Sequence, residues 1–200
     1  MHSIRVMNKL TPADLWPLER YAAERAAFRT RVIAHKKDRT VALGPHVSLL
    51  FEDRLTVQYQ IQEMLRIERI FEAAGIQEEL DAYNPLIPDG CNLKATMLLE
   101  FPDAGVRVER LARLGGIEHR VYAEVHGQAR VYAHADEDMD RSNDTKTSAV
   151  HFLRFEFPPA TISALREGAG LSLGIEDPRL PECAPVPAGS RAALLSDFQR

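Results

Sequence analysis

One long helical segment constrains this chain more than any other feature. At about 100° per residue, the stretch 53–80 places four apolar side chains on one stripe: Val57, Ile61, Met64 and Phe71. Glu68 falls on the same stripe, where a leucine would be expected. A carboxylate on an apolar face must be paired, hydrogen-bonded or protonated, so Glu68 is the first candidate for a site.

Two interpretations of Glu68 stay open. In the first, Glu68 forms a buried ion pair with an arginine from another part of the chain, which is a structural role. In the second, Glu68 is a metal ligand or a general base. Gln60 lies near the same stripe, which indicates a polar pocket rather than an isolated charge.

His46 is a candidate second ligand in a metal site with Glu68. It follows Gly44 and Pro45 at the turn of a predicted hairpin, close in sequence to the helical segment. Packing of the hairpin on the helix could bring it near Glu68 or Glu72, and a histidine with two carboxylates suits iron, manganese or zinc. The alternative is a surface or capping histidine, since the segment holds no Glu-x-x-His pair of the ferritin-like kind.

Tyr83 and Asn84 are the remaining candidate binding residues. They lie where the helical segment ends and a turn-rich loop with two prolines, residues 84–90, begins. Loops on a rigid scaffold often carry function. This loop could act as a lid that works with Gln60 and Glu68 to recognise an amine or a guanidinium. Alternatively, Tyr83 completes the core.

The rest of the pattern predicts an α+β fold. Further helices are expected over residues 18–36, 103–114, 160–167 and 192–198. Strands are expected over residues 40–43, 47–51, 93–101, 121–125, 130–134, 149–157 and 171–175. We therefore expect N-terminal helices, a long central helix and a mostly antiparallel, bent or half-barrel sheet. Residues 7–176 form one domain in this interpretation, and residues 177–200 form a proline-containing tail with a short helix.

The strand predicted at 149–157 alternates between two faces. His151 falls on the core face, as a satisfied histidine at the edge of the core, and Arg154 and Glu156 fall on the opposite face. The acidic stretch 136–146 resembles a calcium loop in its spacing. It lacks the glycine and the glutamate that an EF-hand requires, so we expect a mobile acidic loop.

Composition excludes several classes of protein. With 45% apolar and 27% charged residues, the chain is an ordinary globular one. Its net charge of -4 argues against non-specific nucleic-acid binding, and the basic run 29–39 is interpreted as a solvated helix face. Cys91 and Cys183 show no zinc-site spacing and are expected to be reduced, which fits a cytoplasmic location. No apolar run has the length of a signal peptide or a membrane span.

Three sequence pieces carry a resemblance to a known family: ALGPH, QIQEMLR and ELDAYNPLIP. They are similar to the uncharacterised bacterial family catalogued as domain of unknown function 3501, and the resemblance covers residues 11 to about 175. That family has no established activity and no agreed catalytic residues. Its members are often encoded beside rubrerythrin-like di-iron proteins and iron–sulfur oxidoreductases. The resemblance therefore implies a part in cytoplasmic redox chemistry or peroxide defence.

No motif in the chain fixes a reaction, so whether it is an enzyme stays open. The first hypothesis is an accessory or binding module that docks on a redox protein partner. The second is a metal-dependent enzyme with Glu68, His46 and Glu72 as ligands of iron, manganese or zinc. The third is a small-molecule binding protein that uses Gln60 and Glu68 together with the loop at Asn84. Nucleic acid and membranes are not expected partners, and the oligomeric state stays open, with a homodimer as one option.

Overall fold

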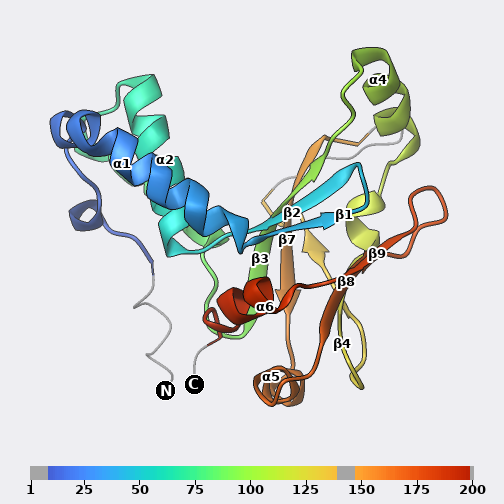
Figure 1. Cartoon of the computed structure of the whole chain (residues 1–200). Helices are drawn as coiled ribbons and strands as arrows, with labels where there is room; N and C mark the ends of the chain where they lie inside the picture. The colour runs from blue at the N-terminus through green and yellow to red at the C-terminus, as the bar shows by residue number, and fades with distance from the viewer. Residues whose placement is uncertain (1–8, 139–146, 199–200) are drawn as a thin grey trace.

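The chain folds into an N-terminal group of helices followed by two antiparallel sheets with short helices around them (Figure 1). The computed structural model describes residues 9–138 and 147–198. Its helices are η1 (Pro12–Asp14), α1 (Leu18–Lys37), α2 (Arg54–Glu68), α3 (Ala73–Tyr83), η2 (Asn84–Leu86), α4 (Ala104–Arg113), η3 (Ile117–Arg120), α5 (Pro159–Arg166) and α6 (Ala188–Leu195). Its strands are β1 (Thr40–Leu43), β2 (Val47–Phe51), β3 (Asn92–Leu99), β4 (Val121–Val125), β5 (Val131–Tyr132), β6 (His134–Ala135), β7 (Val150–Glu156), β8 (Leu171–Ile175) and β9 (Glu182–Pro185). The predicted α+β class is confirmed.

The strands form two sheets that do not close into a barrel. The first sheet has the order β1-β2-β3-β7-β6 and the second the order β5-β4-β8-β9, and every neighbouring pair is antiparallel. One apolar core includes side chains from both sheets. Along β7, His151, Leu153 and Phe155 are buried in this core, while the residues between them are half-buried on the other face. The predicted alternation of this strand is therefore confirmed.

The predicted central helix is divided in two. Asp53 caps the start of α2, because its side chain accepts hydrogen bonds from the backbone N–H groups of Leu55 and Thr56. The helix ends at Glu68, because Arg69 adopts a left-handed conformation with φ of 56°. The break therefore lies at Arg69, inside the helical segment predicted over residues 53–80.

The C-terminal stretch predicted as a tail supplies β9 and α6. β9 pairs with β8, and Leu194 and Phe198 are buried in the shared core. Arg39 fixes this stretch to the first sheet: its guanidinium is 1% exposed, donates to the carbonyls of Phe51 and Glu52, and pairs with Asp197. The interpretation of residues 29–39 as a solvated face is thus wrong for Arg39. Across the described ranges, no helix is both long and apolar enough to cross a membrane.

Candidate functional site

Glu68 does not lie on a buried stripe. It is the last residue of α2 and is exposed, and Phe71, which the helical pattern placed beside it, is 72% exposed. The expectation of a buried carboxylate is wrong, because the left-handed Arg69 ends the helix before the stripe can continue. Gln62 is a buried polar side chain of α2, and its amide hydrogen-bonds to the backbone of Trp16.

The predicted metal ligands are not brought together. His46 packs against Phe101, with 4.7 Å between ring centroids, and its Nδ1 lies 3.1 Å from the carbonyl oxygen of Glu100. Glu72 is the residue before α3, and it is exposed. Within the described residues, His46, Glu68 and Glu72 do not form a cluster of potential metal ligands. Gln60 is exposed on α2.

Tyr83 and Asn84 are placed close to a hollow, but they have different roles. The Asn84 side chain accepts from the backbone N–H of Leu10 at 2.8 Å and donates to its carbonyl at 2.9 Å. Lys9 donates to the carbonyls of Asn84 and Ile87, both at 2.8 Å. Asn84 therefore anchors the loop to the N-terminal segment, whereas Tyr83 lines the hollow.

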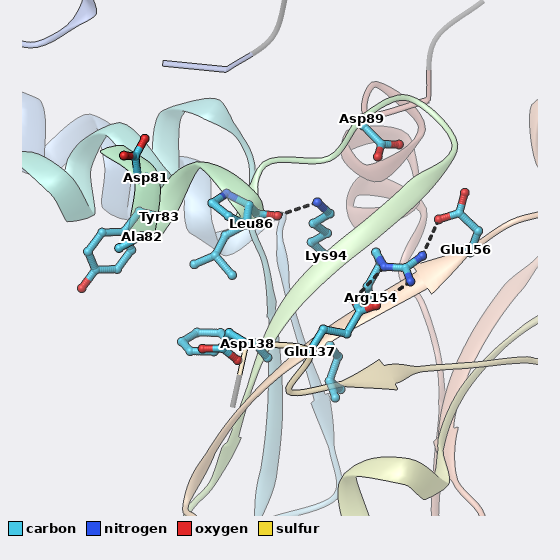
Figure 2. A pocket seen from close by; sticks show the side chains of 13 residues that line it. Asp81, Ala82, Tyr83, Leu86, Asp89, Lys94, Glu137, Asp138, Arg154 and Glu156 are labelled. Atoms are coloured by element: carbon cyan, nitrogen blue, oxygen red, sulfur yellow. Dashed lines mark hydrogen bonds and ion pairs between the residues drawn. The ribbon is translucent and has the colours of Figure 1, made fainter. Parts of the chain in front are cut away.

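This hollow is a groove of about 920 Å³ between the α3–η2 segment and the outer face of the first sheet. Figure 2 shows Asp81 and Tyr83 on one wall and Lys94, Arg154 and Glu156 projecting from the strands. The groove is lined by Asp81, Ala82, Tyr83, Pro85, Leu86, Asp89, Lys94, Glu137, Asp138, Phe152, Leu153, Arg154 and Glu156. We call it the α3–β7 groove.

Arg154 lies at the centre of the groove's charged floor. It stands directly opposite Lys94 in the β3–β7 register, an arrangement of like charges that is unfavourable by itself. Two carboxylates offset it: Glu137 accepts two hydrogen bonds from Arg154 at 2.8 Å, and Glu156 accepts one at 2.7 Å. The pairing with Arg154 lowers the pKa of Glu137 and raises that of Arg154, so both stay ionised at neutral pH.

Lys94 is the second cation of the floor. Its ammonium donates to the carbonyl of Pro85, which ties β3 to the opposite wall of the groove (Figure 2). Burial lowers the pKa of Lys94; Arg154 adds to this effect, while Asp89 opposes it. Both cations of the groove therefore already have partners in the protein.

Cys91 is a thiol that contacts the floor of the groove through Glu156. Its thiol donates to Glu156 at 2.9 Å and to Asp89 at 3.3 Å. Burial, together with these two carboxylates, raises the pKa of Cys91 to about 12. A thiol in this state is a poor nucleophile, because only the thiolate attacks. The site is therefore suited to binding rather than to cysteine-based covalent catalysis.

The balance of charge defines what the α3–β7 groove can hold. Among the described residues, five carboxylates line it against two cations: Asp81, Asp89, Glu137, Asp138 and Glu156 against Lys94 and Arg154. The part of the lining that the structure describes therefore carries an excess of negative charge, which attracts positive ligands. The ring of Phe152 and the side chain of Leu86 supply apolar surface beside these charges. This combination matches a small molecule with a cationic head and an apolar body.

Sequence reasoning found part of this groove. The alternation of 149–157 placed Arg154 and Glu156 on one face, and the proline loop singled out Tyr83. It missed Lys94 and Glu137, although the β3 pattern, which alternates buried and half-buried residues, carries a signal for Lys94. No local signal shows that the end of α3 lies beside this face of the sheet.

Comparison with known proteins places the chain in a family. The family model described as "Protein of unknown function (DUF3501)" matches residues 9–198. The chain belongs to this family. It is also similar to a crystal structure of a novel protein of unknown function from Burkholderia pseudomallei K96243, at 51% identity and a TM-score of 0.91. The match covers 96% of this chain and 100% of that one. No curated protein matches the chain.

Proposed function

We propose that this member of the DUF3501 family binds a small organic cation, an amine or a guanidinium, in the α3–β7 groove. The observation that carries the proposal is the excess of carboxylates over cations in a groove of about 920 Å³. A volume of this size suits a small organic molecule. Arg154 and Lys94 already donate hydrogen bonds to protein groups. They would therefore contribute little to the binding of an anionic ligand.

The recognition we propose divides the ligand between two parts of the groove. The cationic head would lie near Asp81, an exposed carboxylate at the end of α3 that accepts one hydrogen bond from Gln77 at 2.8 Å. The apolar body would pack on Tyr83 and Phe152, since aromatic faces attract cations and apolar chains. The hydrogen bonds of Arg154 to Glu137 and Glu156 would keep its guanidinium on the sheet and reduce its repulsion of the cationic ligand.

Calorimetric titration of the full chain tests this proposal. Agmatine and spermidine serve as cationic probes, and glutarate serves as an anionic control of similar size. We expect saturable binding of at least one cation, no binding of glutarate, and an affinity about tenfold lower for Asp81→Asn, the loss expected for one charge-assisted hydrogen bond. Glu109→Gln removes an exposed carboxylate of α4 outside the groove, so it should bind as the unaltered protein does. Equal loss in both variants, or no heat with any cation, would overturn the proposal.

The redox or peroxide-defence association and the metal-dependent enzyme centred on Glu68 stay predictions of the sequence. Co-purification with a di-iron or iron–sulfur protein is the measurement that addresses the first of them. Elemental analysis of Glu68→Gln beside the unaltered protein addresses the second.

A further inference from the structure

A second cluster of ionisable side chains lies on the other face of β7 from the groove. Glu118 of η3, Asp136 just after β6, and His151 of β7 are 2%, 8% and 0% exposed. One potential ligand atom from each lies within 4.8 Å of the others. Three ionisable groups buried together in a fold of this size call for a physical reason, because each charge loses its hydration.

Asp136 fixes the orientation of the His151 imidazole. Its Oδ2 lies 2.6 Å from Nδ1 of the imidazole, and its Oδ1 accepts from the backbone N–H of Phe152 at 2.9 Å. The backbone of Asp136 is held in the left-handed region, with φ of 50°. A metal ion at Nε2 would replace the proton that this atom shares with the carbonyl oxygen of Ser148, while Nδ1 keeps its hydrogen bond to Asp136. This carboxylate–histidine arrangement is the one that orients histidine ligands in metal sites.

The Nε2 atom faces several oxygen atoms. It lies 2.9 Å from Oγ1 of Thr147, 3.0 Å from the carbonyl oxygen of Ser148 and 3.9 Å from Oε2 of Glu118. Two metal–ligand bonds of about 2.1 Å can span at most about 4.2 Å. The separation of Nε2 and the Glu118 oxygen is therefore compatible with one cation bound to both atoms.

Glu118 is a buried carboxylate with one hydrogen-bond donor among the described residues. It accepts one long hydrogen bond, 3.4 Å from Thr147, and its ion-pair contacts in the described part of the chain are His119 at 3.6 Å and His151 at 3.9 Å. No lysine or arginine of the described ranges lies within ion-pair distance of it. A carboxylate has about four acceptor positions, so Glu118 has acceptor capacity for a cation beyond the contacts that the described side chains supply.

We infer that His151 and Glu118 bind a divalent transition-metal ion, with Asp136 as the residue that orients the imidazole. The oxygens of Thr147 and Ser148 are positioned to complete the coordination. An imidazole with carboxylate and neutral oxygen donors suits manganese, iron or zinc. This site shares no residue with the predicted set of His46, Glu68 and Glu72, and it is separate from the α3–β7 groove.

Metal titration of the full chain tests this inference. Protein purified without an affinity tag is stripped with chelator and then titrated with Mn²⁺ and with Zn²⁺. We expect one equivalent of either ion to bind and the thermal midpoint to rise. Glu118→Gln and His151→Gln should each weaken binding by at least about tenfold, and Asp136→Asn by about 10- to 100-fold. Glu52→Gln changes a buried carboxylate held by Thr56 and Thr96, so it serves as the matched control and should bind as the unaltered protein does.

A measurement on the unaltered protein keeps the inference testable if a variant fails to fold. Long-range ¹⁵N–¹H spectra of the histidine rings should show Nε2 of one buried histidine shifting in proportion to added Zn²⁺ up to one equivalent. Binding of less than about a tenth of an equivalent, or shifts confined to exposed histidines, would overturn the inference. Equal affinity in Glu118→Gln and the unaltered protein would also overturn it.

Discussion

The carboxylate of Asp136 lies 2.6 Å from Nδ1 of His151, and both side chains are buried. The next residue, Glu137, turns to the opposite face of the sheet and pairs with Arg154 in the α3–β7 groove. Two consecutive residues after β6 thus complete two separate constellations on the two faces of β7. We expect changes at either residue to affect one constellation more than the other.

Truncating Glu68 should leave the stability of the protein almost unchanged. Glu68 is exposed at the end of α2, so Glu68→Ala should change the free energy of unfolding by less than about 0.5 kcal/mol. Gln62 is fully buried and hydrogen-bonds to the backbone of Trp16. Gln62→Ala should therefore cost about 1–3 kcal/mol. Urea unfolding at neutral pH measures the change in the free energy of unfolding for both variants. A larger loss of stability for Glu68→Ala than for Gln62→Ala would contradict the placement of α2.

Arg39 should be one of the most sensitive positions of the fold. Its guanidinium is 1% exposed and pairs with Asp197, whose pKa burial raises to about 6 in spite of this partner. Arg39→Met would leave Asp197 and the carbonyl groups of Phe51, Glu52 and Ala193 without this donor, at a cost of about 3–5 kcal/mol. Arg29→Met, on the exposed face of α1, is the control and should cost less than about 0.5 kcal/mol. Similar urea midpoints for the two variants would show that Arg39 does not tie α6 to the sheet.

Acid should weaken the contact between α1 and α2 in a defined window of pH. Arg25 donates two hydrogen bonds to Glu63, at 2.7 and 2.8 Å, and with Tyr21 it lowers the pKa of Glu63 from 4.5 to about 2. Because the pKa is lower in the folded state, the stabilisation is fully present above about pH 4.5 and disappears as the pH falls towards 2.

Unfolding measured between pH 2 and pH 7 tests whether the Arg25–Glu63 pair loses its stabilising effect in acid. The difference in stability between the unaltered protein and Glu63→Gln should be about 2 kcal/mol at neutral pH, with allowance for the solvent that reaches Arg25. It should shrink below pH 4.5. A difference that stays constant across the whole range would show that Glu63 does not titrate with folding.

Cys91 should resist alkylation. Burial and the carboxylates of Glu156 and Asp89 raise its pKa to about 12, whereas Cys183 is exposed on β9. Iodoacetamide at pH 8 should therefore label Cys183 at least about tenfold faster than Cys91, because the thiolate is the reactive form. Peptide mass spectrometry gives both rates. Faster labelling of Cys91 would indicate a reactive thiol beside the groove.

The sequence predicted the elements better than it predicted which of them meet. The two-residue period of β7 is a local property, and it separated His151 from Arg154 correctly. The end of α2 was missed because Arg69 adopts a left-handed conformation without the glycine or asparagine that usually marks one. His151 was predicted to be a satisfied core histidine, and it is buried with hydrogen-bond partners at both ring nitrogens. Its neighbour Glu118 lies 33 residues away along the chain and carries no spacing signal. Tertiary packing brings such pairs together, and the periodicity of a sequence cannot predict which elements pack against each other.

The position of a bound cation tests the central claim most directly. Backbone ¹⁵N–¹H spectra of the full chain are recorded as agmatine is added, with glutarate as the control. We expect saturable shifts concentrated at the end of α3 and on the facing residues of β3 and β7, around Asp81, Lys94 and Arg154. No shifts with agmatine, or shifts centred away from the α3–β7 groove, would contradict the account.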